Sequence, residues 1–419
     1  MSPRHGIGTG APASATTLAI GGLVSLAVAM GIGRFAFTPI LPMMLRDGVA
    51  DIASASWLAS ANYIGYLLGA VLCTLQPWLA WRLSWLPSAF DAPRTVRAGL
   101  AATVLLTLGM ALPWPAAWPM LRFAAGVASA VTLIHTTGWC FAQLAARGSS
   151  AVGGLVFAGP GAGIVVSGIV AGMLVGAHLS AAVGWTLFAV LAALSTAVVR
   201  RIFDHRNDVA PVAAAGTVAA GDATAPPAPR AELATLALAY GLAGFGYIVT
   251  ATFLPVIARA ALPGSPWIAL FWPLFGIGTI VGALMAMHIG DATDRRLLLA
   301  AAHAVQAGGV ALGLLWPTVS GFVAGSFLVG LPFTTITYFA LQEARRLRPR
   351  QAASAIGLLT ALYGAGQIAG PPMVSALVAR SATAAAGFDQ SLAIAATALL
   401  LGTLLYLELW RRWPMPAHR

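Results

Sequence analysis

The sequence predicts an all-α integral membrane protein with twelve transmembrane helices in two parallel six-helix pseudo-repeats. Three observations lead to this fold class. The 419 residues are 59% hydrophobic and only 8% charged, a composition that soluble domains of this length do not approach. Apolar stretches long enough to cross a bilayer, which takes roughly 20 residues, recur along the chain. The second half also repeats positions of the first.

The apolar stretches number twelve and are spread over the whole chain. They cover residues 17–42, 54–79, 98–114, 116–144, 150–176, 180–203, 233–258, 266–288, 297–316, 320–344, 353–380 and 386–410. They are too long for barrel strands and do not alternate in polarity, so transmembrane strands are excluded. A helical bundle is expected.

The chain divides once, at a Pro/Ala/Gly/Thr-rich segment that cannot bury a core. We expect a cytoplasmic tail at 1–16, an N-terminal half at 17–203, a cytoplasmic linker at 204–232, a C-terminal half at 233–410 and a second tail at 411–419. An offset of 213 residues superimposes Gly31 on Gly244, Gly33 on Gly246, Leu41-Pro42 on Leu254-Pro255, Arg46 on Arg259 and Gly65 on Gly278. Gly126 matches Gly330 at an offset of 204. In membrane proteins built from two parallel six-helix halves, a binding site is expected near the midplane, between the repeats.

The charges between the spans predict the orientation. All 23 basic residues are arginines, and 18 of them fall in the two tails and the alternate loops on the same side. The positive-inside rule therefore places both termini in the cytoplasm. Absence of lysine together with abundant alanine points to a GC-rich bacterial genome, and so to a bacterial cytoplasmic (inner) membrane.

Several classes of partner are excluded by the sequence. The sequence has no basic patch with interleaved aromatic residues, so it does not indicate nucleic-acid binding. The net charge of +11 fits an anionic inner leaflet. Cys73 and Cys140 fall inside spans, so we expect neither a disulfide framework nor a metal site. No cofactor motif is present. We expect the partners to be a small-molecule substrate and the lipid bilayer, with protons as a candidate coupling ion, and the protein to be a monomer.

Several motifs carry a family resemblance over nearly the whole chain. The six-plus-six layout, Arg122-Phe123-Ala124-Ala125-Gly126, Gly159-Pro160 and the loop 290–296 resemble the major facilitator superfamily. The stretches GIGRFAFTPILP (31–42), NYIGY (62–66) and YGLAGFGY (240–247) resemble its YbfB/YjiJ-type subgroup. The N-terminal copy of the family's charged loop pattern is interrupted by residues 81–90. The resemblance implies that the first and fourth helices of each half line a central cavity.

Two arginines lie inside spans, where an unpaired charge is expensive. Arg34 is eight residues from Pro42, and Arg122 is in the fourth span, while every acidic residue lies in a loop or near a span end. One reading makes both arginines a fixed positive site for an anion, since guanidinium groups match carboxylate and phosphate geometry. In the other reading, Arg34 extends toward the outer surface and Arg122 satisfies backbone carbonyls at a helix break.

Further candidates are polar residues at similar depth or on the same helix faces. The predicted substrate-binding residues are Arg34, Asn62, Arg122, Tyr240, Tyr247, Ser326, Thr337 and Gln367. A largely small and polar stripe beside Arg122 (Gly126, Ser129, Leu133, Thr136, Thr137 and Cys140) indicates either an aqueous pathway or a tight helix contact. His135 and His303 are weaker candidates for carrying protons, because ordinary helix packing explains them better and His135 faces away from the expected cavity.

Glycines and prolines predict where the helices bend or pack closely. The predicted conformational residues are Gly33, Pro42, Gly126, Gly159, Pro160, Gly370 and Pro371. The family reads the motif of the fifth span as an antiporter signature, but bending and close packing explain it as well. Asp294, Arg295, Arg296 and Glu343 are expected at a cytoplasmic gate, where ion pairs or plain positive-inside charge are both consistent with them.

The sequence therefore predicts a secondary active transporter that moves small organic solutes by alternating access, with an anionic or carboxylate-bearing substrate favoured. Proton-linked efflux of neutral or amphipathic compounds is the alternative within transport. A lipid-handling membrane protein is the alternative of another class. An enzyme is not expected, because no cluster of Asp, Glu, His or Ser residues suited to catalysis lies near one membrane face.

Overall fold

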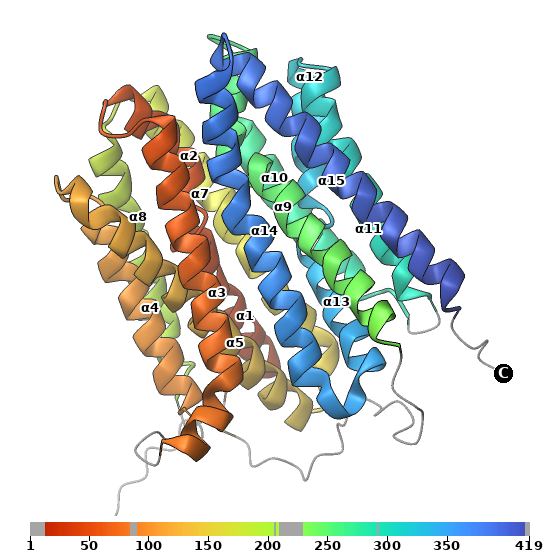
Figure 1. The fold of residues 1–419 in the computed structure, drawn as a ribbon. Helices are drawn as coiled ribbons and strands as arrows, with labels where there is room; N and C mark the ends of the chain where they lie inside the picture. The colour runs from red at the N-terminus through yellow and green to blue at the C-terminus, as the bar shows by residue number, and fades with distance from the viewer. Residues whose placement is uncertain (1–12, 84–89, 205–206, 209–228, 291–292, 415–419) are drawn as a thin grey trace, which may run out of the picture.

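The computed structural model describes residues 13–83, 90–204, 207–208, 229–290 and 293–414. Within these ranges the chain is helical and has no strand (Figure 1), which confirms the all-α class. The helices are α1 (Ala15–Leu26), α2 (Phe37–Arg46), α3 (Ile52–Arg82), α4 (Ala92–Gly109), α5 (Trp118–Ala146), α6 (Gly154–Phe157), α7 (Gly159–Gly176), α8 (Ala181–Val199), α9 (Arg230–Ala261), α10 (Ile268–Ala286), α11 (Arg295–Leu315), α12 (Val319–Gly330), α13 (Phe333–Leu347), α14 (Ala352–Arg380) and α15 (Ala384–Arg412), with a π-helical segment η1 (Ala27–Ile32) after α1. Most of the predicted linker and parts of both predicted tails lie outside the described residues.

Eleven helical segments of the described chain are long and apolar enough to cross a membrane. The third predicted span, 98–114, is not among them; it corresponds to α4, which begins earlier and ends earlier than expected. Arg94 and Arg97 fall within its first two turns and make that end of the helix polar. It nevertheless packs along α5 and α8 (Figure 1), and so occupies the place of a span.

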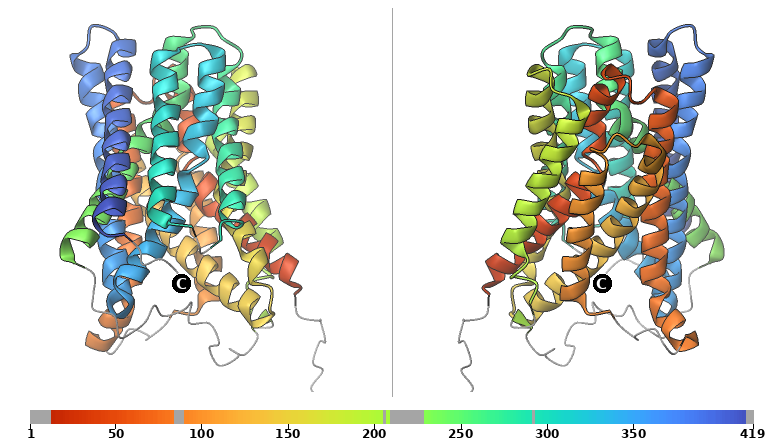
Figure 2. Two further views of the ribbon diagram at one scale, coloured as in Figure 1. Left: turned by 90° about the vertical axis from the view of Figure 1, so that its right-hand side faces the viewer. Right: turned by 90° about the vertical axis from the view of Figure 1, so that its left-hand side faces the viewer.

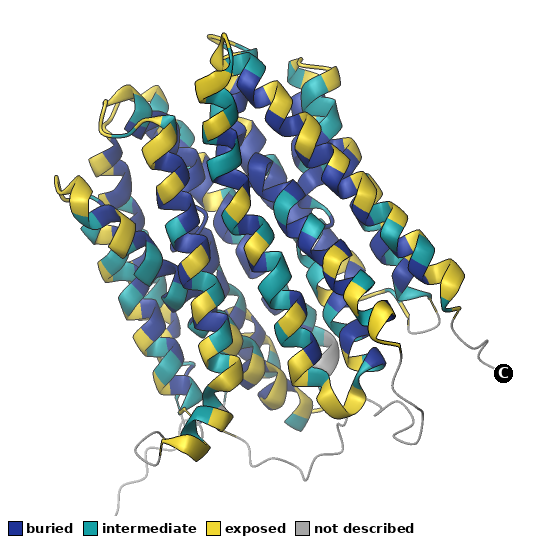
Figure 3. Cartoon of the chain, viewed as in Figure 1, coloured by how far each residue is buried: buried dark blue, intermediate teal, exposed yellow. Residues whose placement is uncertain are grey.

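The surface of the bundle is apolar around its middle. Leu105 on α4, Val198 on α8 and Leu404 on α15 are among many large hydrophobic side chains that are more than half exposed. Exposed residues follow the outward faces of the helices, and buried residues line the inner faces (Figure 3). Apolar area of this kind is stable in contact with lipid hydrocarbon and not with water.

The two ends of the bundle differ. The start of α1 and the end of α15 lie at the same end (Figures 1 and 2), which we call the terminal end; the other is the closed end. The helices spread apart toward the terminal end (Figure 2). At the closed end, the Thr38 hydroxyl of α2 donates to the carbonyl oxygen of Ala251 in α9 at 2.6 Å. The Tyr63 hydroxyl of α3 lies 2.8 Å from that of Thr252 in α9.

The internal repeat is visible in equivalent close helix contacts. A Cβ atom on Gly126 of α5 would lie 2.0 Å from the carbonyl oxygen of Asn62 in α3. A Cβ on its counterpart Gly330, at the end of α12, would lie 2.1 Å from the carbonyl oxygen of Phe275 in α10. Because Asn62 and Phe275 are 213 residues apart, both members of each pair are equivalent in the repeat.

The halves meet along two long helix pairs, α3 with α14 and α7 with α10. Glycines make the second contact flat: a Cβ on Gly161 would lie 2.7 Å from the carbonyl oxygen of Gly276. Other predicted glycines face their own half, because Gly159 lies against Leu23 and Gly370 against Ile248. Such glycine contacts allow the backbones to approach closely.

Two spans that the sequence predicts as single stretches are broken. The first span is interrupted between η1 and α2, at Gly33 to Ala36. The tenth is interrupted between α12 and α13, at Leu331 and Pro332. In contrast, Pro42 lies inside α2 and Pro371 inside α14, and neither ends its helix. Breaks inside a membrane need polar partners for the freed backbone groups.

Candidate functional site

Arg34 lies at the break of the first span and reaches across the boundary between the halves. Its Nη2 donates to Oε1 of Gln367 in α14 at 2.8 Å. The amide nitrogen of Gln367 in turn donates to the Tyr247 hydroxyl in α9. Tyr247 is the repeat equivalent of Arg34, so one amide side chain contacts both equivalent positions.

The Arg34 guanidinium is buried, with 3% of the residue exposed. It lies 4.0 Å from the ring centroid of Tyr66 and 5.2 Å from those of Tyr63 and Phe35. Its Nε has no hydrogen-bond partner among the described residues, and no described carboxylate forms an ion pair with it. Aromatic faces stabilise a desolvated cation by up to about 2 kcal/mol each. The unpartnered Nε leaves this guanidinium with hydrogen-bonding capacity for an anion.

Arg122 has a different environment, although it is as deeply buried. Its Nη1 donates to the carbonyl oxygen of Gly33 at 3.2 Å and its Nη2 to that of Arg34 at 3.0 Å. Its guanidinium also lies 4.9 Å from the Phe37 ring centroid. The planar fork thus satisfies two neighbouring carbonyls at the break of the first span, which is the arrangement of the structural reading.

Asn62 and the polar stripe of α5 hold this region together. The Asn62 amide donates to the carbonyl oxygen of Arg122 at 2.9 Å. Ser129 donates to the carbonyl oxygen of Ala29 in η1 at 2.6 Å, and the Thr136 hydroxyl lies 3.0 Å from that of Ser25. Of the two readings of this stripe, the structure therefore shows the tight helix contact.

Tyrosines surround Arg34 and its partners. Five of the seven tyrosines in the chain form this set, which we call the tyrosine cluster: Tyr63 and Tyr66 of α3, Tyr240 and Tyr247 of α9, and Tyr363 of α14. Tyr240 stacks on Tyr363 with ring centroids 4.5 Å apart and planes inclined by 21°, and Tyr247 stacks on Tyr363 at 5.8 Å and 20°. The Tyr240 hydroxyl donates to the Thr337 hydroxyl at 3.1 Å.

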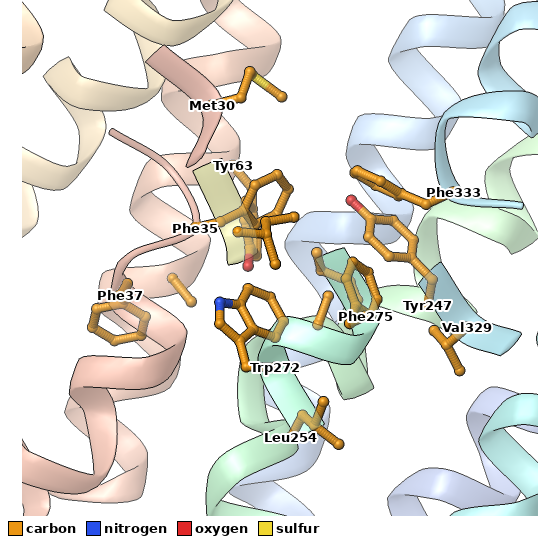
Figure 4. Packing of buried hydrophobic residues seen from close by; sticks show 14 of the residues in the cluster. Met30, Phe35, Phe37, Tyr63, Tyr247, Leu254, Trp272, Phe275, Val329 and Phe333 are labelled. Carbon is orange, nitrogen blue, oxygen red and sulfur yellow. The ribbon is translucent and has the colours of Figure 1, made fainter. Parts of the chain in front are cut away.

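A second group of rings lies between the halves beside the two breaks, and we call it the aromatic barrier: Phe35, Trp272, Phe275 and Phe333. Phe35 lies in the break of the first span and contacts Phe333, which follows the break of the tenth, at a centroid distance of 5.7 Å (Figure 4). Trp272 and Phe275 of α10 complete the group at 5.1 Å from each other. The two broken spans thus meet through aromatic rings between the halves.

Ser326 is not brought to Arg34. It lines a small cavity inside the C-terminal half, together with Thr250, Gly309 and Phe322. The hydroxyls of Ser326 and Thr250 have no hydrogen-bond partner among the described residues. His303 is packed elsewhere in this half, against Tyr406 at 4.8 Å, and the ring of His135 lies against its own helix, 2.8 Å from the carbonyl oxygen of Val131.

At the terminal end, two of the residues predicted for the gate, Arg296 and Glu343, belong to a buried ion-pair network inside the C-terminal half, and Arg295 is the first residue of α11. Arg296 of α11 pairs with Glu343 of α13 at 2.8 Å and with Glu232 of α9. Arg346 pairs with Glu343 at 2.7 Å. Asp294 accepts a hydrogen bond from the backbone nitrogen of Arg296 and caps α11. The network joins α9, α11 and α13 within one half.

Several residues of this region are absent from the predicted site. Tyr66, Tyr363 and the aromatic barrier are aromatic residues in apolar spans, which sequence alone does not separate from core residues. Glu232 is 64 residues from Arg296, and nothing in the sequence indicates their pairing. A usable signal exists for the tyrosines, because five of only seven occur at matching depths of three spans.

Comparisons with known proteins agree with this architecture. A family model described as "Uncharacterised MFS-type transporter YbfB" matches residues 26–407. The crystal structure of a point mutant of the nucleoside transporter NupG superimposes with a TM-score of 0.68 at 16% sequence identity, covering 94% of this chain and 100% of that one. No curated protein matches the sequence significantly.

Proposed function

Because the chain belongs to the family of uncharacterised MFS-type transporters of the YbfB type, we propose that it carries a small organic anion across the membrane by alternating access, with Arg34 as the residue that binds the anionic group. One observation carries this proposal. Arg34 is a buried cation between the halves, with an unpartnered Nε and no carboxylate paired with it among the described residues. The Nε of Arg122 is unpartnered as well, but both terminal nitrogens of Arg122 donate to backbone carbonyls. An anionic substrate would supply the missing charge.

The arrangement of the halves supports alternating access. The closed end is joined by Thr38 with Ala251 and Tyr63 with Thr252, whereas the helices spread apart toward the terminal end (Figure 2), where Phe157 of α6 and Tyr338 of α13 stay in contact at a ring-centroid distance of 6.3 Å. With the terminal end in the cytoplasm, as the arginine bias favours, this conformation would face inward.

Arg122 takes the supporting role in this proposal. Both of its terminal nitrogens donate to backbone carbonyls, so it fixes the break from which Arg34 projects. Asn62 positions Arg122, and Gln367 orients Arg34 from the other half. Thr337 and Tyr240 form the wall nearer the terminal end.

Ligand-induced thermal stabilisation of the purified full-length protein tests the proposal. A ligand at 100 times its dissociation constant stabilises the native state by about 2.7 kcal/mol. We expect some members of a panel of organic acids and phosphates to raise the Tm of the wild type and of Arg380→Gln, which alters an exposed arginine at the end of α14. Arg34→Gln should abolish the shift. Stabilisation of all three proteins by neutral compounds alone, including nucleosides, would contradict the anion site and favour efflux of neutral solutes.

A further inference from the structure

The tyrosine cluster has a composition that a simple anion site does not require. A guanidinium needs polar acceptors, yet besides Gln367 the groups around Arg34 are the rings of Tyr66, Tyr63 and Phe35. In the same cluster, Tyr240, Tyr363 and Tyr247 form a run of nearly parallel rings, with interplanar angles of 21° and 20°. The buried charge of Arg34 therefore lies in an aromatic environment.

The cluster lies on the side of Arg34 from which a ligand would arrive. Along α3, Tyr66 is one turn nearer the terminal end than Asn62. Along α14, which runs in the opposite direction, Tyr363 is one turn nearer that end than Gln367. The two tyrosines are at the same level, because a Cβ on Gly364 would lie 2.9 Å from Cδ1 of Leu67. Both are partly exposed, whereas Arg34, Tyr240 and Tyr247 are buried.

We propose that the substrate is a planar aromatic carboxylate, whose ring packs edge-on or offset against the exposed parts of the Tyr66 and Tyr363 rings while its carboxylate accepts hydrogen bonds from Arg34. Aromatic rings prefer offset stacking at centroid distances of about 4.5–7 Å, the range that the cluster already uses. A carboxylate in the plane of a ring matches the flat guanidinium fork. This inference rests on the proposed function and names the substrate class of the same site.

Equilibrium binding to the purified full chain separates the ring from the charge. The three probes are benzoate, cyclohexanecarboxylate, which has the same charge and a saturated ring, and benzamide, which is aromatic and neutral. Benzoate should bind about tenfold more tightly than cyclohexanecarboxylate, because the saturated ring cannot stack. Benzamide should bind more weakly than benzoate, because it cannot pair with Arg34.

A matched pair of variants tests whether the tyrosine cluster causes the preference for an aromatic ring. Tyr363→Phe keeps the ring and should leave the ratio of benzoate to cyclohexanecarboxylate affinity within about twofold of the wild type. Tyr363→Leu removes the ring and should reduce that ratio to near one. The wild-type comparison holds even if the leucine variant does not fold.

The outcomes distinguish this inference from the proposed function. Equal binding of benzoate and cyclohexanecarboxylate would overturn the aromatic preference and leave the anion site intact. Binding of benzamide as tightly as benzoate would overturn both, since the charge would then contribute nothing. Failure of benzoate to bind at about 10 mM, a concentration at which even a weak specific site would be occupied, while another acid binds in an Arg34-dependent manner, would overturn the aromatic class alone.

Discussion

Arg34 and Arg122 are equally buried but differ in what their guanidinium groups contact. Arg122 satisfies two backbone carbonyls at the helix break, whereas Arg34 has one side-chain acceptor, Gln367, and aromatic neighbours. Replacing Arg122 leaves carbonyls unsatisfied in an apolar region, while replacing Arg34 removes a charge that is expensive to bury.

We therefore expect Arg122→Gln to destabilise the protein by about 1–3 kcal/mol, and Arg34→Gln to leave the Tm without ligand unchanged or raised. Thermal unfolding of both variants in the same detergent measures this difference. Equal loss of stability in the two variants would show that Arg34 is also a structural residue.

At the scale of helices, glycines set how closely the equivalent pairs α3 with α5 and α10 with α12 approach. We expect Gly126→Ala and Gly330→Ala each to cost about 1–3 kcal/mol, because the added methyl group meets a backbone carbonyl at 2.0 and 2.1 Å. Gly138→Ala in α5 is the control, since a Cβ there has no neighbour within 4 Å among the described residues. It should be neutral or stabilising, as alanine favours helix. Similar Tm values for all three variants would mean that the helices can separate without cost.

At the scale of the whole molecule, the closed end should open and close during each transport cycle. We expect the double variant Thr38→Cys with Ala251→Cys, in a chain with Cys73 and Cys140 replaced by alanine, to be joined by a short bis-methanethiosulfonate cross-linker, because the Thr38 hydroxyl donates to the Ala251 carbonyl oxygen across the two halves at 2.6 Å. Cross-linking should stop uptake into proteoliposomes and reduction should restore it. The single variants control for the substitutions themselves, and uptake by fully cross-linked protein would argue against alternating access.

The fold was predictable because long apolar stretches and positive loops are properties of composition. Part of the site followed too: depth along each span brings Arg34, Asn62, Arg122, Tyr247 and Gln367 to one region. Ser326 shows the limit of that reasoning. Its position on the helix predicts the direction in which its side chain points, but not which residues the side chain contacts. The pairing of Arg296 with Glu232 and the breaks of the first and tenth spans depend on contacts between helices, which no local pattern encodes.

The equivalence of Arg34 and Tyr247 has a consequence for how such a protein can change its cargo. The duplicated positions have diverged into a charge in one half and an aromatic hydroxyl in the other, and both contact the amide of Gln367. In a symmetric dimer of two N-terminal halves, two copies of Arg34 would face each other and Gln367, which belongs to the C-terminal half, would be absent. In the proposed site the two halves depend on each other: a substitution at Arg34 would alter the preferred charge, whereas a substitution at Tyr247 would alter the preferred shape.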